Sequence, residues 1–472
     1  MVPSKPLRVL KKNSKIFPML HILKRVILLI PFCVFAVAPF AQTGNYQTVK
    51  VAPAALKSDF LLLRDTLQKI HPGLYRYVSK ADIDKMFDSC LATIHDSMTV
   101  TDFYVLTSYA IAAIKDGHTN CRLPAQVMSD YTGMMKVFPA MVLFMHGRAF
   151  VLCCKQNGDL SEAELLTING HSLSEIIPQV FRYISSDGNI SSRKNWEASG
   201  VFPLLYNFIW GPSDSFGVRY RTKSGDIRNA VLQGDLIKNV ACANPFSRPK
   251  KYLTLEYKPG NVAVLTVKTF FDGFLHQTGE NFKGFLDSSF KDLRHRGARR
   301  LIIDIRGNQG GNDENGAFLY AYLSPTPFRY YESLSSTTEV FPESRHPDSK
   351  VQYPSENNFS GKVYFLTDGR SFSTAADFAA IAKSNNRGLF VGEETGGGYY
   401  GNTSGDDVTV TLPNTQITCR IPMVKYVNAV KKAAYPDRGV IPDHIVYPTI
   451  SDFVENKDSQ MTFCLGLIQH SN

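Results

Sequence analysis

The feature that most constrains the fold is the alternation of continuously apolar stretches with helical runs between residues 260 and 450. Strands are expected at 262–270, 301–307, 362–369 and 388–394, separated by runs with the three-to-four-residue spacing of amphipathic helices at 280–297, 313–323 and 373–384. Strands that are apolar on both faces and alternate with helices indicate a largely parallel sheet flanked by helices. The sequence therefore predicts an α/β domain over residues 260–472.

Two regions are expected before this domain. Residues 43–135 carry apolar stripes at helical spacing and predict an N-terminal helical domain, with Ser79 and Thr101 capping its second and third helices. Residues 136–240 predict a small β domain of short strands. One strand–turn–helix segment in it resembles a PDZ-like module, although any unit of that kind gives the same pattern. The polar, proline-containing residues 241–259 predict a linker.

The N-terminal residues predict a targeting segment for export and not a part of the fold. Seven basic residues precede an apolar run of about 16 residues that ends in small residues near Ala41, which predicts a signal peptide over 1–41. The alternative is a membrane anchor, but the run is shorter than the roughly 20 residues needed to span a bilayer and contains two prolines. Translation starts at Met1 or at Met19. The protein is expected in the periplasm or outside the cell, with no stable membrane insertion.

Charge and cysteine content exclude several functions. Removal of residues 1–41 lowers the net charge from +10 to +3, so the basic character does not indicate nucleic-acid binding. The eight cysteines are scattered, without a CxxC pair or a Cys/His cluster, which excludes a disulfide scaffold and argues against a zinc site. Most are expected to be buried, with one or two bridges in an oxidising compartment. No metal or cofactor is predicted.

A serine at a strand-to-helix turn is the first candidate for chemistry. Residues 367–373 contain the end of the strand expected at 362–369 and the turn after it, and Ser373 opens a helix of small residues. The backbone amide of Thr374 would be an unpaired donor at the helix N-terminus and would stabilise an oxyanion. The alternative interpretation is that Ser373 only caps the helix, which is a favoured place for serine.

Two glycine-rich loops follow other expected strands. These are Arg306–Gly311 and Gly392–Gly398. Glycines let a backbone approach a ligand closely, but loops that need a positive φ also use them. Neither loop ends in Gly-Lys-Ser/Thr, so neither is a phosphate-binding loop of the Walker type.

The order of these motifs is more specific than any one of them. A strand ending in D-x-R-G-N-x-G-G is followed after about 60 residues by F-S-x-A-x-x-F and after about 20 more by G-E-x-T-G-G. This series resembles the C-terminal processing (tail-specific) peptidase family, which includes the tricorn core protease and the retinoid-binding-protein fold. The resemblance covers most of 260–445 and reaches DGHT at 116–119 and GVIPD at 439–443. It implies a ClpP/crotonase-like catalytic domain and a serine peptidase acting on peptides or proteins.

The resemblance also implies roles for single residues. Ser373 matches the nucleophile, and the amides of Thr374 and of Gly310 or Gly311 match the oxyanion hole. The Ser-Lys branch has its lysine base 25 residues after the serine, where this chain has a glycine. The tricorn-like branch has a histidine base in the N-terminal part, which His118 matches. An imidazole with a pKa near 6.5 suits a base near neutral pH.

The third member of the catalytic set is open. The relay serine of tricorn-like enzymes falls on Gly117, and their glutamate falls on Pro436, beside Asp437. Asp437 either orients His118 or is an ordinary loop residue, and Asp116 can hold the backbone of its motif without a role in catalysis.

Two rival interpretations remain at this stage. The base could be Lys383 or His444. The protein could also bind a ligand or peptide without catalysis, as the retinoid-binding relatives do.

Overall fold

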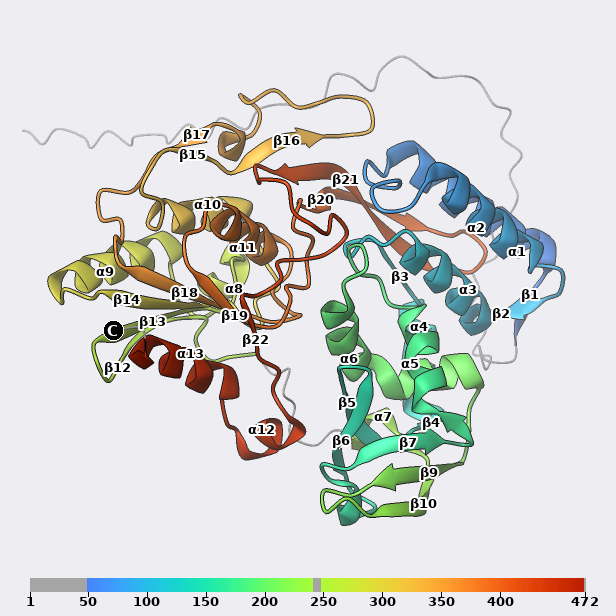
Figure 1. Ribbon diagram of the computed structural model, residues 1–472. Coiled ribbons are helices and arrows are strands. Elements are labelled where there is room, and N and C mark those ends of the chain that lie inside the picture. Colours follow the sequence, from blue (N-terminus) through green and yellow to red (C-terminus); the bar gives the residue numbers. More distant parts are fainter. Residues whose placement is uncertain (1–48, 241–247, 471–472) are drawn as a thin grey trace, which may run out of the picture. The chain divides into compact units, whose positions relative to one another are not determined.

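The computed structural model describes residues 49–240 and 248–470 (Figure 1). The predicted signal peptide at 1–41 and residues 241–247 of the predicted linker lie outside the described residues. Among the helices that are described, none combines the length and the apolar character needed to cross a bilayer.

The sheet expected in the C-terminal half has six strands in the order β12-β13-β14-β18-β19-β22. All neighbouring pairs are parallel except β12 with β13. The α/β class and the largely parallel sheet are therefore confirmed. The strands are β12 (Leu253–Lys258), β13 (Val262–Val267), β14 (Arg300–Asp304), β18 (Lys362–Thr367), β19 (Leu389–Gly392) and β22 (His444–Ile445).

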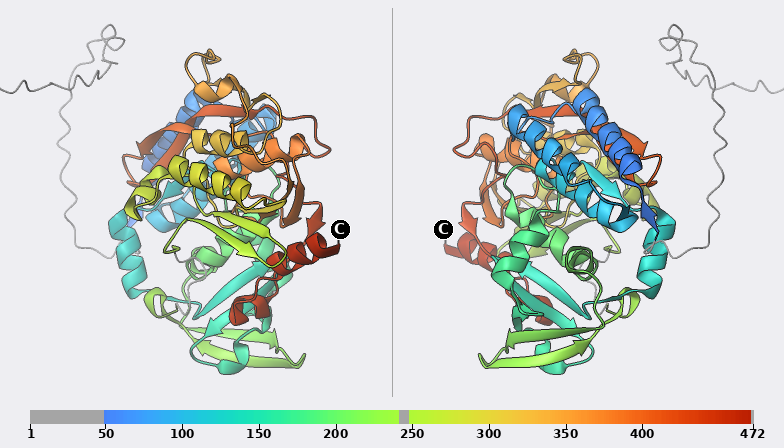
Figure 2. Two further views of the ribbon diagram at one scale, coloured as in Figure 1. Left: turned by 90° about the vertical axis from the view of Figure 1, so that its left-hand side faces the viewer. Right: turned by 90° about the vertical axis from the view of Figure 1, so that its right-hand side faces the viewer.

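Helices cover both faces of this sheet, as the apolar strands require. On one face, α9, α10 and α11 share a core with residues such as Leu301 and Phe365. On the other face, α13 packs Cys464 and Ile468 against Ile302 and Leu366. Figures 1 and 2 show these helices on opposite sides of the strands. The helices are α8 (Asp272–Gln277), α9 (Phe282–His295), α10 (Asp313–Ala321), α11 (Thr374–Ser384), α12 (Ile450–Glu455) and α13 (Ser459–His470).

The predicted linker at 241–259 needs a correction, because Leu253–Lys258 form the edge strand β12. Leu253, Leu255 and Tyr257 pack against the core of the parallel sheet. Alternate residues of this short segment are apolar, as in a strand with one covered face. The prolines that suggested a linker lie outside the paired residues.

The N-terminal region contains the helices α1 (Pro53–Ile70), α2 (Lys80–Ala92), α3 (Val100–Ala113) and α4 (Ala125–Met134), and its being a separate domain stays a prediction. Ser79 caps α2 by accepting a hydrogen bond from the amide of Asp82. The cap of α3 is Thr99 and not Thr101, because Thr99 forms a capping box with Asp102. Three short strands accompany these helices, namely β1 (Lys50–Val51), β2 (Met98–Thr99) and β3 (Asn120–Arg122).

A long hairpin from the C-terminal half joins the N-terminal helices. Its strands β20 (Thr403–Thr411) and β21 (Thr418–Asn428) pair with each other, and β21 also pairs with β3 and β16 (Tyr331–Ser335). Ile417 and Ile421 enter the same core as Leu56 and Phe60 of α1. Distant parts of the chain therefore meet around the segment that carries the DGHT motif.

Residues 136–240 contain the predicted short strands. The two strands around His146-Gly147 are confirmed as β5 (Ala140–Met145) and β6 (Arg148–Cys154), whereas the helix α6 (Ser191–Trp210) was not predicted. Gly200 and Pro203 interrupt its helical pattern. The PDZ-like nature of this region stays a prediction. The other elements are β4 (Lys136–Val137), β7 (Glu164–Ile168), β8 (His171–Ser172), α5 (Leu173–Phe181), β9 (Ser215–Arg221), β10 (Ile227–Gln233), β11 (Asp235–Leu236), α7 (Ile237–Val240), β15 (Phe328–Arg329) and β17 (Val351–Gln352).

Candidate active site

Ser373 lies at the carboxyl end of β18, on the turn that leads into α11. Its backbone has φ 55° and ψ −130°, and its side chain makes no capping hydrogen bond to the helix. A non-glycine residue in this conformation costs about 1–3 kcal/mol and persists only where its surroundings hold it. Serines on such strained strand-to-helix turns project their hydroxyl from the sheet edge. The geometry therefore does not support the interpretation of Ser373 as a simple helix cap.

Backbone contacts between three loops hold this turn. The carboxylate of Asp368 accepts a 3.0 Å hydrogen bond from the amide of Gly307. The amide of Phe372 donates to the carbonyl of Asn308, and the amide of Gly396 donates to the carbonyl of Ser371. The two glycine-rich loops therefore flank the serine, as their positions after parallel strands imply.

The loop at 306–312 approaches Ser373 so closely that only glycine fits. A Cβ atom on Gly310 would lie 2.7 Å from the Cβ of Ser373. The amide of Gly310 already donates to the side chain of Asn308, at 2.8 Å, so it is not the free donor that the sequence suggested. Of the two oxyanion-hole candidates, Gly310 and Gly311, only Gly311 therefore remains. The carbonyl of Gly311 accepts a hydrogen bond from the hydroxyl of Thr374. The amide of Thr374 is at the first helical position, which has no partner within the helix.

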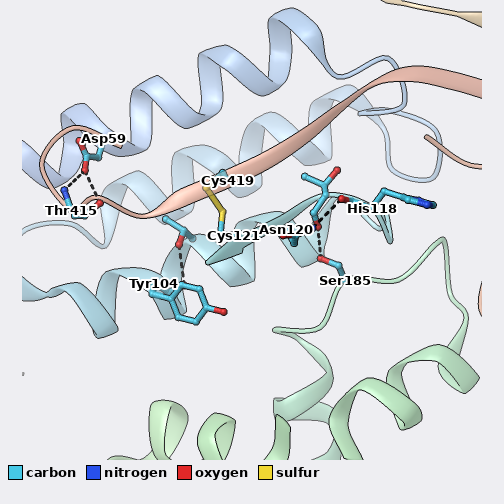
Figure 3. Close-up of a disulfide and its surroundings, with 10 residues drawn as sticks. Asp59, Tyr104, His118, Asn120, Cys121, Ser185, Thr415 and Cys419 are labelled. Atoms are coloured by element: carbon cyan, nitrogen blue, oxygen red, sulfur yellow. Dashed lines mark hydrogen bonds between the residues drawn. A yellow bond between two sulfur atoms is a disulfide. The ribbon is translucent and has the colours of Figure 1, made fainter. Parts of the chain in front are cut away.

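His118 reaches the same place from the N-terminal region. Asp116 fixes its loop, because one carboxylate oxygen accepts from the amides of His118 and Thr119 at 2.9 and 3.0 Å. The imidazole stacks on the ring of Phe372, with centroids 4.5 Å apart and planes 25° from parallel. Figure 3 shows His118 beside the strand that carries Cys121. The fold thus brings a histidine into contact with the residue that precedes Ser373, although 255 residues separate His118 from Ser373 in the sequence.

Burial determines the charge state of this histidine. Desolvation lowers the pKa of His118 to about 4, although the negative charge of Asp116 opposes the shift. Within the described part of the chain, its Nδ1 atom is buried and has no hydrogen-bond partner. The imidazole is therefore neutral near pH 7, the form that accepts a proton.

Asp187 is a site residue that the sequence analysis missed. One of its carboxylate oxygens, one of Asp116 and a ring nitrogen of His118 lie within 4.8 Å of one another. The side chain of Asp187 is 1% exposed and accepts hydrogen bonds from the amides of Gly117 at 2.8 Å and Gly398 at 3.1 Å. Desolvation and the nearby charge of Asp116 raise its pKa to about 6. No motif marks this residue, which precedes the unpredicted helix α6.

The fold and the motifs agree with known proteins. The profile of peptidase family S41 matches residues 261–446. These residues form a peptidase family S41 domain. The expected family and the expected class of enzyme, a serine-type peptidase, are thereby confirmed.

Two solved structures of CPAF show the same fold. CPAF complexed with lactacystin is 14% identical at a TM-score of 0.61, with 88% of this chain and 97% of that chain covered. Mature CPAF is 14% identical at a TM-score of 0.59, with coverages of 87% and 95%. The photosystem II D1 C-terminal processing protease is 14% identical over 86% of this chain and 98% of its own, at a TM-score of 0.41.

Among the described residues, the carboxylate of Asp437 forms no hydrogen bond or ion pair with His118. Its carboxylate accepts a hydrogen bond from the side chain of Asn189, and its carbonyl accepts from the amide of Asn189 at 2.8 Å. The carboxylates next to His118 are instead those of Asp116 and Asp187. Asp437 therefore holds the loop that carries Asp187 through its contacts with Asn189.

At residue 398, where the Ser-Lys branch has its lysine, this chain has a glycine. A Cβ atom on Gly398 would lie 2.5 Å from the hydroxyl oxygen of Tyr77 and 3.7 Å from the Cβ of Asp187. Tyr77 and Asp187 thus occupy the space into which a side chain at 398 would extend.

Neither rival base is near Ser373. Lys383 lies at the far end of α11, about 15 Å away along an 11-residue helix, and its ammonium pairs with Asp443 at 2.5 Å. His444 is in β22 and packs on Phe463 of α13, on the face of the sheet opposite α11.

Two cavities reach the glycine loop of the S41 domain. One, of about 710 Å³, includes Gly307, Gln309 and Lys268 in its lining, and the other, of about 450 Å³, includes Met141 and Pro203. They share Trp196, Gln309 and Arg370. Gln309 directly precedes Gly310, whereas neither lining includes Ser373 or His118.

Two groups of side chains in the described residues have the composition of a metal site. One is Asp116, His118 and Asp187, whose carboxylates already accept backbone hydrogen bonds. The other is Asp313, His346 and Asp348.

Proposed function

We propose that this protein is an exported serine endopeptidase that hydrolyses peptide bonds by Ser-His acyl transfer, with Ser373 as nucleophile and His118 as base. The observation that carries the proposal is the stacking of His118 on Phe372, the residue before the strained Ser373. A serine hydroxyl is a weak nucleophile unless a base accepts its proton, and a neutral imidazole supplies that base.

In the proposed reaction, Ser373 and His118 carry out acylation and then deacylation. The hydroxyl oxygen of Ser373 attacks the substrate carbonyl carbon while its proton moves to His118. The amides of Thr374 and Gly311 stabilise the resulting oxyanion. His118 then protonates the leaving amine, the carbon–nitrogen bond breaks, and an acyl-enzyme remains. Water, deprotonated by His118, hydrolyses this ester and restores Ser373.

Asp187 is the positioning residue in this proposal. His118 gains a positive charge when it accepts the proton, and a carboxylate held nearby stabilises that charge. The amides of Gly117 and Gly398 fix the orientation of the Asp187 carboxylate, which supports this role. Asp116 holds the backbone of the histidine loop through the amides of His118 and Thr119.

Residue 398 supports the Ser-His assignment over a Ser-Lys one. This chain has no lysine there, and the hydroxyl of Tyr77 lies where a side chain would begin. The substrate is proposed to be an extended peptide or protein segment lying in the groove lined by Trp196, Gln309 and Arg370.

Export is supported by two independent features. The first is the predicted signal peptide over 1–41. The second is the disulfide between Cys121 and Cys419, since such bonds persist in oxidising compartments. Mass spectrometry of the protein from the secreted and periplasmic fractions is expected to find a mature N-terminus near residue 42, and an intact Met1 in the cytosol would contradict export.

The catalytic proposal is tested by labelling with a fluorophosphonate probe. The wild type should label, and Ser373→Ala and His118→Ala should lose labelling by at least 100-fold. Ser336→Ala and His95→Ala are matched controls, since Ser336 is half-buried like Ser373, His95 is exposed and both lie outside the site, so these variants should label like the wild type. All variants are first checked for a native melting transition.

The rival interpretation is a binding protein without turnover. If the folded wild type does not label, Ser373 is not an activated nucleophile and the proposal fails. Labelling that survives Ser373→Ala would instead place the nucleophile elsewhere. Loss in Ser373→Ala but not in His118→Ala would keep the nucleophile and reject the base.

A further inference from the structure

A second cluster of ionisable side chains lies outside the proposed catalytic set. Asp313 begins α10, and His346 and Asp348 lie in the segment that follows β16, at the short 3₁₀ turn Pro347–Ser349. A carboxylate oxygen from each aspartate and one imidazole nitrogen lie within 4.8 Å of one another. The cluster joins two segments that are more than 30 residues apart in the chain.

Two atoms of this cluster are buried without a hydrogen-bond partner in the described structure. They are Oδ2 of Asp348 and Nδ1 of His346. Asp348 is only 5% exposed. Burying a polar atom without a hydrogen bond costs about 1–3 kcal/mol of folding free energy, and a ligand bound to these two atoms would remove that cost. The other imidazole nitrogen, Nε2, is 3.1 Å from Asp313. This contact places the imidazole and the Asp313 carboxylate side by side, where both could contribute to one site.

The negative charge of the cluster also favours a bound cation. Among the described residues, no lysine or arginine lies within salt-bridge distance of Asp348, and the nearby Lys283 pairs with Glu314 at 3.8 Å. Two carboxylates beside one imidazole carry a net charge of about −2 when the imidazole is neutral, and either protonation or a bound cation neutralises buried charge of this kind. Asp313 and His346 keep 24% and 21% of their side-chain surface exposed, which leaves an ion a path from solvent.

We propose that Asp313, His346 and Asp348 bind a divalent transition-metal ion, with Zn²⁺ as the best fit. Imidazole together with carboxylate oxygens suits zinc, whereas calcium takes six to eight oxygen ligands. Ligands at about 2.1 Å from a tetrahedral zinc ion are about 3.4 Å apart. The three ligand atoms therefore need to close in by about 1.4 Å at most. Water completes the coordination.

This site would act on the loop beside the nucleophile. Asp313 follows Gly311 by two residues, and the hydroxyl of Thr374 donates to the carbonyl of Gly311 at 2.9 Å. A metal ion that ties Asp313 to the 346–348 segment would restrain the end of this loop. The inference does not depend on the proposed catalysis, because a metal can bind whether or not Ser373 is reactive.

The test is zinc binding to the purified protein after treatment with EDTA and dialysis. Isothermal titration is expected to show one site for ZnCl2, and Zn²⁺ at 100 times its Kd should raise Tm by about 3 °C. CaCl2 is expected to do neither. His346→Gln and Asp348→Asn should each weaken zinc binding by at least 100-fold while the metal-free proteins keep a native melting transition.

Two control variants decide whether the effect belongs to this site. His95→Gln removes a histidine from an exposed His–Asp pair and should bind zinc like the wild type. His118→Gln alters the other cluster of this composition. If zinc binding is lost in His118→Gln and kept in His346→Gln, the ion binds at the serine site and the proposal is wrong. Absence of any zinc binding to the wild type would overturn it as well, leaving His346 as the centre of an ion-pair cluster.

Discussion

The replacement Asp187→Asn tests the catalytic geometry most directly. The change keeps the size of the side chain and removes its negative charge. In the wild type the carboxylate accepts from the amides of Gly117 and Gly398 and lies close to the imidazole of His118. The variant therefore separates the electrostatic contribution of Asp187 from its volume.

The expected loss follows from the distance between the charges. An ion pair 4.8 Å apart at an effective dielectric constant of about 20 is worth about 3.5 kcal/mol. This energy is available only when His118 is protonated, during the reaction, so its loss should slow the reaction about 300-fold. Asparagine also has a single acceptor oxygen for two amide donors. One buried amide therefore loses its partner, which should lower the free energy of unfolding by about 1–3 kcal/mol.

The assay is the second-order rate of fluorophosphonate labelling at pH 8, with the melting transition measured in parallel. Asp437→Asn is the matched control. It removes the carboxylate that the sequence alone suggested, and because that carboxylate contacts Asn189 the labelling rate should change by less than about threefold. The difference between wild type and Asp187→Asn should also shrink below pH 6, where the raised pKa leaves Asp187 uncharged.

A specific result would refute this reasoning. If Asp187→Asn labels at the wild-type rate at pH 8 and Asp437→Asn is slow, the acidic partner is the one suggested by the sequence. If both variants label normally, neither Asp187 nor Asp437 supports His118, and Asp116 is the remaining neighbouring carboxylate.

Three further predictions rest on the same structure. Because burial holds the folded pKa of His118 near 4, below its ordinary value of 6.5, His118 contributes stability above pH 6.5 that is lost as the pH falls toward 4. Tm measured from pH 7 to pH 4 should therefore fall more in wild type than in His118→Gln, and equal slopes would contradict the assigned burial. Gly398→Lys should lower stability by about 1–3 kcal/mol through its clash with Tyr77 and should not restore labelling to His118→Ala, whereas restored labelling would indicate a latent Ser-Lys site. Cys419→Ser should cost about 2–5 kcal/mol in denaturant unfolding and slow labelling, because the disulfide to Cys121 closes a loop of 298 residues near His118, and an unchanged midpoint would show that the bond is dispensable.

The order of elements in the S41 domain was predictable because it depends on local patterns. Apolar stretches such as 301–307 and 362–369 became central parallel strands, and the helix after Ser373 begins where expected. The errors came from weaker local signals. The short edge strand Leu253–Lys258 has only alternating apolar residues, and α6 contains Gly200 and Pro203 within its helical pattern.

The oxyanion loop shows where motif matching is insufficient. Gly310 and Gly311 fit the same motif equally well, since both follow the same strand. Only the structure shows that the side chain of Asn308 accepts a hydrogen bond from the amide of Gly310. A hydrogen bond between residues two apart depends on loop dihedral angles, which the residue types alone do not specify.

By itself, the sequence determined the α/β class, the position of Ser373 at a strand end and the absence of a lysine at residue 398, because each depends on the identity and spacing of neighbouring residues. Only the tertiary structure decided what surrounds His118 and Gly398. Asp187 comes from the loop before α6, Phe372 from the turn after β18, and Tyr77 from the segment after α1. These segments meet because their backbone groups find hydrogen-bond partners, and their apolar faces are buried, only by packing against regions far apart in the chain. Such long-range contacts leave no periodic signal in the sequence.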